Sequence, residues 1–395
     1  MSFNIALSGI KAINDQLTTI SHNIANTGTY GYKAGRANFA TMVAGTQSNG
    51  AYIGSVTQNI SLGGSVFATG RGLDAAIQGN GFFVTKDSDG STMYTRVGIF
   101  QRDAEGYMVD AFGRRAQGYA AGGAFGDIRI PTEVEPAKAS DSLEYTGNLS
   151  ADWTAPKTPN FDKDDDSSFN HSVSSTVYDS LGRQHIVTQY FVKSAAPSTD
   201  VTAYYAMDGE IVGGSTPKTE TLKFDTNGQM TAPAAPFALD LGTPDGASPL
   251  SVKVNYAGTT QVAGDATTSV NRDNGYAAGV PGEPTIDSKG NIVVQYSNGQ
   301  KRTVGTLAMA NFASPDGLTA VGDTAWVASA ASGGPLYGTA GKGAFGKLAP
   351  GSLELSNADV TNELVDMMTA QRNYQANSKV LSTENQMMQS LMQAL

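Results

Sequence analysis

The chain has 395 residues, 46 of them glycine and none cysteine, and it carries a formal net charge of −10. The acidic balance argues against sequence-independent binding of nucleic acid, and the lack of cysteine excludes disulfides, thiolate metal sites and a cysteine nucleophile. This length predicts two to four domains, and a composition rich in Gly, Ala, Ser and Thr is typical of a turn-rich β protein.

The first predicted element is an amphipathic helix over residues 1–26, where apolar side chains recur at alternating steps of three and four. Its apolar stripe comprises Phe3, Ile10, Ile13, Leu17, Ile20 and Ile24. Lys11 and Asp15 are the only charged residues from 1 to 32, and Gln, Asn, Ser and Thr fill the remaining surface. Because uncharged polar groups cost far less to desolvate than ions, we expect copies of the same chain to cover this surface.

The helix is predicted to end near Asn26, where threonines and two glycines interrupt the periodicity. The N-terminus lacks a cationic region, an unbroken apolar run and a small-residue cleavage site, so we expect no cleavable secretory signal. No run approaches the roughly 18 apolar residues that a membrane-spanning helix needs. If the protein leaves the cytoplasm, we expect another route.

The segment that follows is predicted to be β-rich. Residues 38–72 are polar and dotted with glycine, and their single candidate strand, residues 56–62, predicts an extended connector rather than a packed domain. From residue 73 to 145, short apolar runs alternate with turn signals such as Asn80-Gly81 and Asp89-Gly90, which are strong markers of a β-hairpin. This pattern predicts an antiparallel β domain.

A second β domain is predicted after a loop rich in structure-breaking residues, 153–166, which ends in an acidic run, 162–166. Strand patterns with a period of two then recur, for example at 173–177 and 186–192. The same pattern resumes at 292–296 before a glycine-rich stretch leads to the last helix.

Residues 360–395 predict a long helix, because an apolar heptad runs through five repeats without a slip and no proline or glycine interrupts it. The candidate contact residues of this helix are Val360, Leu364, Met367, Tyr374, Leu381, Met388 and Leu395. Neither terminal stripe can bury itself alone. The two ends are therefore predicted to form one coiled-coil module.

These elements predict a mainly β, multi-domain protein with α-helical coiled-coil termini, in which nested β domains are inserted between an N-terminal and a C-terminal helix. If the termini meet, each outer domain is an insertion in the one inside it. The predicted parts are a helical module of residues 1–32 and 358–395, an extended connector of 33–72 and 341–357, a split first β domain of 73–145 and 285–340, and an outer β domain of 146–284.

The sequence singles out no catalytic, cofactor or metal site. The histidines His22, His171 and His185 lack metal-ligand spacing. The acidic run 162–166 is similar to the start of a calcium loop, but Ser167 stands where the glycine belongs and Val173 where the bidentate acid belongs. Residues 79–81 enter a strand instead of opening a helix, so they predict a turn and not a phosphate cradle. A carboxylate pair for glycosidic chemistry stays open, because its separation is not visible in a sequence.

Four stretches resemble the signatures of the axial proteins of the bacterial flagellum, a family of rod, hook and hook-associated subunits. They are residues 21–33, 77–84, 94–100 and 362–377. The residues that carry the resemblance are Ser21, Asn23, Ala25, Asn26, Thr27, Gly31, Tyr32, Lys33, Gly79, Asn80, Gly81, Phe82, Phe83, Gln371, Arg372 and Tyr374. Within this family the large central region, 146–284, resembles the hook subunits by its position and length.

The resemblance implies a non-enzymatic structural subunit that polymerises with itself into the flagellar hook, a curved and flexible tube that transmits torque from the motor to the filament as a universal joint. It implies that the terminal helices line a central channel and that the β domains lie outward. It further implies an extracellular location, reached by type III export without a cleavable signal peptide. The implied partners are the distal rod subunit, the hook–filament junction protein, the hook cap and the flagellar type III export apparatus, with no nucleic acid, small-molecule substrate or cofactor.

Two alternatives stay open from the sequence. One is a distal rod subunit of the flagellum, which would be rigid instead of flexible. The other belongs to a different class: a secreted β-rich hydrolase or adhesin that uses its helical ends to oligomerise.

Overall fold

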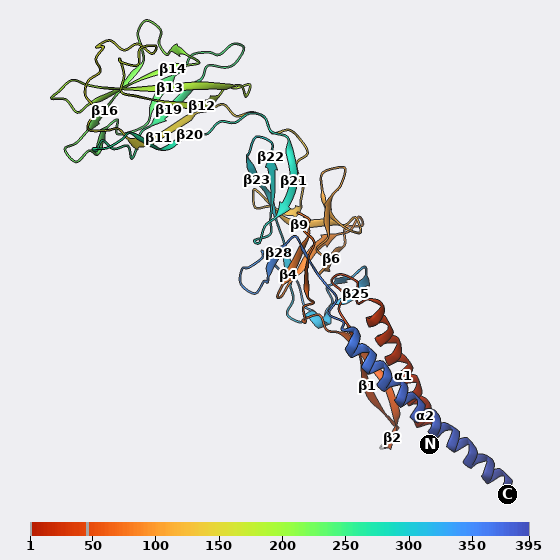
Figure 1. Ribbon diagram of the computed structural model, residues 1–395. Helices are drawn as coiled ribbons and strands as arrows, with labels where there is room; N and C mark the ends of the chain where they lie inside the picture. Colours follow the sequence, from red (N-terminus) through yellow and green to blue (C-terminus); the bar gives the residue numbers. More distant parts are fainter. Residues whose placement is uncertain (1, 45–46, 395) are drawn as a thin grey trace. The chain divides into compact units, whose positions relative to one another are not determined.

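The computed structural model describes residues 2–44 and 47–394, and it divides the chain into two compact units (Figure 1). The first unit consists of Met1–Thr132, Gly282–Gln295 and Lys301–Leu395, and the second consists of Glu133–Pro281 and Tyr296–Gln300. Within the described ranges, neither helix is long and apolar enough to cross a membrane. The predicted fold class, mainly β with helical termini, is confirmed.

The first unit contains both helices, α1 (Ser2–Ala25) and α2 (Val360–Ala394), which lie side by side (Figure 1). The helices are antiparallel, since Asn23 near the end of α1 bonds Glu363 near the start of α2. Ile13, Ile20 and Ala370 are buried where the helices meet, and Leu17, Ile24 and Met367 pack around them. The two ends of the chain therefore share one small apolar core.

A long hairpin of strands β1 (Gly35–Ala44) and β2 (Gln47–Gln58) packs along α1. Its antiparallel register shifts between Asn38 and Phe39 and again between Met42 and Val43. The sequence predicted a single strand in this segment. The hairpin was missed because polar residues and glycine interrupt the apolar pattern of both strands.

The remaining strands of the first unit come from two distant parts of the chain. They are β3 (Val66–Ala68), β4 (Ala75–Gln78), β5 (Phe82–Lys86), β6 (Thr92–Thr95), β7 (Phe100–Arg102), β8 (Met108–Asp110), β9 (Arg115–Ala120), β10 (Phe125–Asp127), β21 (Pro281–Ile286), β22 (Asn291–Tyr296), β23 (Lys301–Leu307), β24 (Met309–Asn311), β25 (Thr319–Gly322), β26 (Ala325–Val327), β27 (Leu336–Gly338), β28 (Lys347–Pro350) and β29 (Ser352–Glu354), with a single 3₁₀ turn at Pro315–Gly317.

The two parts interleave in one sheet with the order β21-β22-β23-β9-β5-β6-β26-β25, so the outgoing and returning chain complete the same structure. Two smaller ladders, β28 with β4 and β29 with β3, join the parts again. The core contains Phe82, whose ring meets Phe312 and Trp326 edge to face at centroid distances of 5.9 and 5.8 Å. Edge-to-face contacts of this kind add to the free energy of burial.

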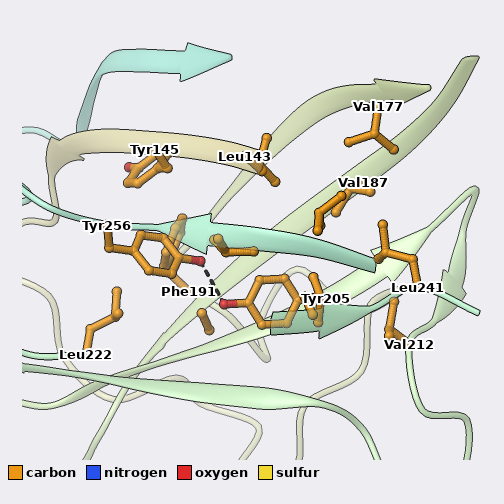
Figure 2. Packing of buried hydrophobic residues seen from close by; sticks show 14 of the residues in the cluster. Leu143, Tyr145, Val177, Val187, Phe191, Tyr205, Val212, Leu222, Leu241 and Tyr256 are labelled. Carbon is orange, nitrogen blue, oxygen red and sulfur yellow. Dashed lines mark hydrogen bonds between the residues drawn. The ribbon is translucent and has the colours of Figure 1, made fainter. Parts of the chain in front are cut away.

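The second unit is a sandwich of two sheets. Its strands are β11 (Ser142–Asn148), β12 (His171–Tyr178), β13 (Gln184–Lys193), β14 (Val201–Met207), β15 (Glu210–Ile211), β16 (Thr219–Phe224), β17 (Met230–Ala232), β18 (Phe237–Asp240), β19 (Ser251–Asn255) and β20 (Thr267–Asp273). One sheet has the order β12-β13-β14-β16-β17, with β15 beside β14, and the other has the order β18-β19-β11-β20. Alternate residues of both sheets fill the shared core (Figure 2).

A hydrogen-bonded chain crosses this core from one sheet to the other. The hydroxyls of Tyr205 on β14 and Tyr256 after β19 are 2.8 Å apart (Figure 2), and Tyr256 donates to Oε1 of Gln189 on β13 at 2.5 Å. Burial raises the pKa of both phenols, so they stay protonated at neutral pH. The hydroxyls of Tyr205 and Tyr256 are therefore both partnered, as a low-dielectric interior favours, whereas the buried hydroxyl of Tyr145 in the same core has no hydrogen-bond partner among the described residues.

Several hairpins begin with an aspartate whose side chain closes the turn. Asp179 Oδ1 accepts from the backbone N–H groups of Leu181 and Arg183 at 2.9 and 2.8 Å. In the first unit, Asp110 Oδ1 accepts in the same way from the N–H groups of Phe112 and Arg114, both at 2.9 Å. Gly182, at φ +80°, supplies the left-handed residue that the turn needs. The hairpin predicted at Asp89-Gly90 is confirmed, because β5 and β6 pair across it. The hairpin predicted at Asn80-Gly81 is wrong: the chain does turn there, but β4 pairs with β28 and β5 pairs with β6, β9 and β24, so the two strands beside this turn belong to different sheets.

Candidate self-assembly surface and its base

The apolar side chains predicted to drive assembly are divided between the helix seam and the surface. Ile13 and Ile20 are buried, whereas Ile10, Leu17, Ile24, Met367 and Leu381 are half-buried. The exposed members are Phe3, Val360, Leu364, Tyr374 and Met388. Leu395 lies outside the described residues.

Small and polar residues of α2 form most of its contact with α1. Ala370 is fully buried there, Glu363 bonds α1, and a Cβ on Gly9 would lie 3.2 Å from Oδ1 of Asn377. Small residues such as Gly9 and Ala370 let the two backbones approach closely. Of the large heptad residues, Met367 packs against the seam, whereas Val360 and Leu364 stay 44 and 46% exposed.

The C-terminal end of α2 extends past the start of α1 (Figure 1). Four apolar side chains lie exposed there, and we call them the apolar tail face: Met387, Met388, Leu391 and Met392, with exposed fractions of 54, 63, 57 and 76%. Single exposed apolar residues are ordinary on a protein surface, but a contiguous group on one helix marks an interaction site. Within the described part of the chain, this group has no covering element.

A groove of about 470 Å³ lies between α1, α2 and the β1–β2 hairpin. Ile5, Ile13 and Phe39 form its apolar lining, and the glycine and alanine residues that also line it are too small to fill it. The groove and the apolar tail face are two unfilled apolar features of the same helical end.

Asn23, a residue of the family signature, ties the base of this helical end together. It is 2% exposed, and its Nδ2 donates to the backbone oxygen of Gly35 and to Oε1 of Glu363, each at 2.8 Å. Its Oδ1 accepts from the N–H of Gly35 at 2.8 Å and from the hydroxyl of Tyr32 at 3.2 Å. One amide thereby fixes α1, the start of β1 and the start of α2. Burial raises the pKa of Glu363 and that of Tyr32.

A buried ion cluster lies just beyond Asn23. Lys33 Nζ is 2.6 Å from Oε1 of Glu354 and donates to the backbone oxygen of Leu62 at 2.7 Å, and neither charged side chain is more than 1% exposed. Arg96 Nη1 lies 3.5 Å from Oε2 of the same glutamate. Burial lowers the pKa of Lys33 and of Arg96, and the charge of Glu354 offsets part of this effect. One anion thus serves two cations from separate segments.

The turn at residues 79–81, which belongs to the family signature, contacts the same ion cluster. Arg96 donates to the backbone oxygen of Gly79 at 2.9 Å and stands over the ring of Phe82, 5.0 Å from its centroid. Gly79 and Gly81 have backbone φ angles of +109° and +122°, which residues other than glycine rarely adopt, so this turn around Asn80 needs glycine at both positions. Phe83 packs its ring edge to face against Phe100 at 5.2 Å.

The other signature residues lie at the end of α1 or on the surface of α2. Asn26 donates to the backbone oxygen of His22 at 2.9 Å, and Thr27 donates to that of Ile24 at 2.9 Å, which satisfies carbonyls at the helix end. Gly31, at φ +67°, donates to the backbone oxygen of Glu354 at 2.8 Å. The exposed signature residues are Ser21, Ala25, Gly79, Asn80, Gln371, Arg372 and Tyr374.

Four residues that organise this base were not among the sequence candidates: Arg96, Glu354, Asn357 and Ala370. Asn357 accepts from the N–H of Ala34 at 2.7 Å and donates to the backbone oxygens of Asn59 and Leu62 at 2.9 and 3.0 Å. A usable signal existed for Glu354, since it is a lone acid in an otherwise uncharged stretch after the glycine-rich segment. The partners of Asn357 are backbone groups, which leave no trace in a sequence.

No group of three or more His, Asp or Glu residues within the described ranges could hold a metal ion. His185 lies between Asp208 and Asp179, at 2.6 and 3.5 Å, and His22 is exposed on α1. In the acidic run 162–166, Asp164 pairs with Lys163 at 2.8 Å. These contacts hold loops in place, and none points to a reacting group.

The comparisons with known proteins first define a class. Family models match this chain as a flagellar basal body protein FlaE D2 domain at residues 148–276, a flagellar hook protein FlgE/F/G D1 domain at 76–151 and a flagellar basal body rod FlgEFG protein C-terminal region at 349–394. Together these matches cover residues 76–276 and 349–394, and the last of them includes all of α2. They indicate an axial protein of the flagellum.

Relatives over the full length narrow the class. The chain is 37% identical to the flagellar hook protein FlgE of Salmonella typhimurium over 99% of both chains, and 36% identical to that of Escherichia coli, also over 99% of both. It is 29% identical to the hook protein of Treponema pallidum over 98% of this chain and 97% of the other. The chain belongs to the flagellar hook protein family, FlgE. The recognition of hook subunits from the sequence is therefore confirmed.

A solved structure agrees at the level of the fold. The crystal structure of Helicobacter pylori flagellar hook protein FlgE2 superposes with a TM-score of 0.53 at 15% identity and covers 71% of this chain and 98% of its own. At 15% identity, this similarity is evidence for the fold alone.

Proposed function

We propose that this chain is a structural subunit, and not an enzyme, that polymerises with copies of itself into the flagellar hook. The hook would be a curved, bendable tube that transmits torque from the motor to the filament. The observation that carries the proposal is the apolar tail face of α2, four exposed apolar side chains on a helix that α1 leaves uncovered. Covering each of them fully would contribute about 1.5–3 kcal/mol.

In this proposal residues 1–32 and 358–395 form the inner wall of the tube, and residues 33–72 with 341–357 connect it to the β domains. The split domain of 73–145 with 285–340 and the outer domain of 146–284 would lie progressively outward and slide past their neighbours as the tube bends. The self-assembly residues would be those of the two helical stripes, apart from Ile13 and Ile20, which are buried between α1 and α2 of the same chain, together with the apolar tail face. The signature residues would fix the base of the helices.

The further partners follow from membership of the family. We expect the distal rod subunit below the hook, the hook–filament junction protein above it and a hook cap during assembly. Export would proceed through the flagellar type III apparatus without a cleaved signal peptide, to an extracellular site. The C-terminal end of α2, which carries the exposed apolar tail face, should be only marginally stable before assembly, and this suits a chain that is threaded unfolded.

The test removes the tail contact without touching the monomer core. Met388→Asp with Met392→Asp places two charges on side chains that are 63 and 76% exposed, so the monomer should fold normally. We expect the unaltered chain to form tubes with a central channel, visible by electron microscopy after concentration or salt is raised. We expect the double variant to stay monomeric with an unchanged circular dichroism spectrum.

A matched control places the same charges on exposed apolar residues of the second unit. Leu181→Asp with Ile186→Asp, at 59 and 50% exposure, should leave tube formation intact. A tail variant that polymerises as well as the unaltered chain would contradict the proposal. So would an unaltered chain that forms no tube even on purified hook fragments.

A further inference from the structure

A basic hollow of about 520 Å³ lies on the first unit, away from the helices and their apolar surfaces. Three lysines line it, Lys289, Lys342 and Lys347, together with neutral groups that include Gln78, Asn291 and Thr306. No acidic side chain is part of its lining. We call it the lysine hollow.

Three separate segments place these lysines. Lys347 is the first residue of β28 and pairs with Gln78 of β4. Lys342 lies in a turn that the N–H of Gly341 closes by donating to the oxygen of Gly346 at 2.9 Å. Lys289 lies in the turn between β21 and β22. The backbone at all three positions is therefore held by hydrogen bonds, although the ammonium groups are free to move.

These ammonium groups have no counterion in the described part of the chain, where none of the three lies within 4.0 Å of a carboxylate. Asp287 is close in sequence, but both of its oxygens accept from its own turn, Oδ1 from the N–H groups of Lys289 and Asn291 and Oδ2 from Nδ2 of Asn291. A site of three uncompensated positive charges is notable on a chain whose net charge is −10. Such a patch attracts an acidic partner.

The chain itself carries a segment with the complementary charge. The acidic run 162–166 holds four aspartates and one lysine, and the Asp164 side chain is 77% exposed. The loop is anchored to the second unit, because the ring of Phe161 stacks on Tyr204 at 4.2 Å and Asp165 accepts from Thr158 at 2.8 Å. It thus presents carboxylates on a fixed base.

We propose that the lysine hollow of one subunit receives the acidic run 162–166 of a second copy of this chain. The proposal rests on the polymer proposed above and identifies one contact within it. Three lysines spread over a wide hollow match several spaced carboxylates better than one compact anion. Exposed ion pairs are individually weak and screened by salt, so such a contact can break and form again as neighbouring subunits move.

Zero-length cross-linking tests the contact directly. Tubes are grown from an equal mixture of ordinary and ¹⁵N-labelled full-length chains, and a carbodiimide then joins carboxylates to amines that are already in contact. We expect peptides in which Lys289, Lys342 or Lys347 is joined to the run 162–166, with one isotope from each chain. Tubes that yield no such peptide, or only peptides with both halves from the same chain, would overturn the proposal.

Charge reversal supplies the second test. Lys342→Glu with Lys347→Glu, or Asp164→Lys with Asp166→Lys, should each lower the salt concentration at which tubes dissociate, and combining the two pairs should restore it. Asp162 is left unchanged because it accepts from the N–H of Asp164 at 3.0 Å. The matched control, Lys218→Glu with Lys223→Glu on exposed positions of the second unit, should have no effect.

The outcomes separate this contact from the polymer itself. If the unaltered chain forms no tubes, the proposed function fails before the contact is tested. If tubes form and all variants dissociate at the same salt concentration, only the contact is wrong. If inorganic phosphate at constant ionic strength binds the hollow while no mixed-isotope peptide forms, the hollow is an anion site and the proposal is again overturned.

Discussion

At the scale of single residues, the base of the helices depends on charges that water does not reach. Lys33 and Arg96 come from separate segments of the chain, and both form ion pairs with Glu354. The N–H of Gly64 also donates to Glu354 Oε1, at 2.9 Å. Moving two cations and an anion out of water is costly, and the cluster is tolerated because each partner compensates the others. It therefore specifies which segments meet rather than adding much stability.

We expect Glu354→Gln to destabilise the first unit by about 3–5 kcal/mol, because it leaves two buried cations without an anion. Urea unfolding measures this change. The chain has two tryptophans, and Trp326 lies in the first unit, so a Trp153→Phe background makes fluorescence report that unit alone.

A partly exposed ion pair of the first unit provides the control for Glu354→Gln. Asp127 lies 3.0 Å from Arg115, with side-chain exposures of 26 and 46%, so Asp127→Asn should cost only about 0–1 kcal/mol. Equal losses in the two variants would show that the buried cluster has no special role at the base of the helices.

At the scale of elements, the aspartates that close hairpin turns make the stability of the fold depend on pH. Burial alone would raise the pKa of Asp179, but the N–H of Arg183, its guanidinium and the N–H of Leu181 together lower it from an unfolded value of 3.8 to about 2. A carboxyl group with a lowered folded pKa stabilises the fold above its unfolded pKa. That contribution is lost as the pH falls from 3.8 toward 2.

Asp179→Asn should therefore lower the stability of the second unit at pH 7 by about 1–2 kcal/mol and flatten its acid unfolding between pH 4 and pH 2. Fluorescence of Trp153 in a Trp326→Phe background follows that unit. Asp225→Asn is the control, because Asp225 accepts from two backbone N–H groups of its turn, at 2.8 Å each, but has no arginine partner. If Asp179→Asn left the acid unfolding of the second unit unchanged, the lowered pKa of Asp179 would not be a source of its pH dependence.

The elements also show what a sequence can predict. The helices and the hairpin at Asp89-Gly90 were predictable because their signals are local. The turn at Asn80-Gly81 was predictable for the same reason, but the partners of the strands beside it were not, because β4 pairs with the distant β28. The β1–β2 hairpin was missed because polar residues and glycine interrupt the apolar pattern of its strands. The seam between the helices was equally hidden, because Ala370 and Gly9 act by being small, whereas periodicity draws attention to large apolar residues. The signature pointed to Asn23 and Lys33, but their partners Glu363 and Glu354 lie more than 300 residues away.

At the scale of the whole molecule, the free chain and the proposed polymer should differ most at one end. In the single chain, α2 has α1 beside it at Glu363 and Ala370, but no residue of the ranges 2–44 and 47–394 covers the apolar tail face. A helical end of this length without tertiary contacts is marginal in water. The second unit has its own core and needs no neighbour to fold around it.

We therefore expect amide hydrogens of residues 385–393 to exchange almost as fast as in an unfolded chain while the protein is monomeric. In tubes their protection should rise about 100-fold or more, because covering even two apolar side chains contributes ~3 kcal/mol. Hydrogen exchange with mass spectrometry measures both states, and β13 and β14 of the second unit serve as the internal control that should not change. Strong protection of residues 385–393 in the monomer would mean that the tail is stable without neighbours, and its burial could then not be what drives assembly.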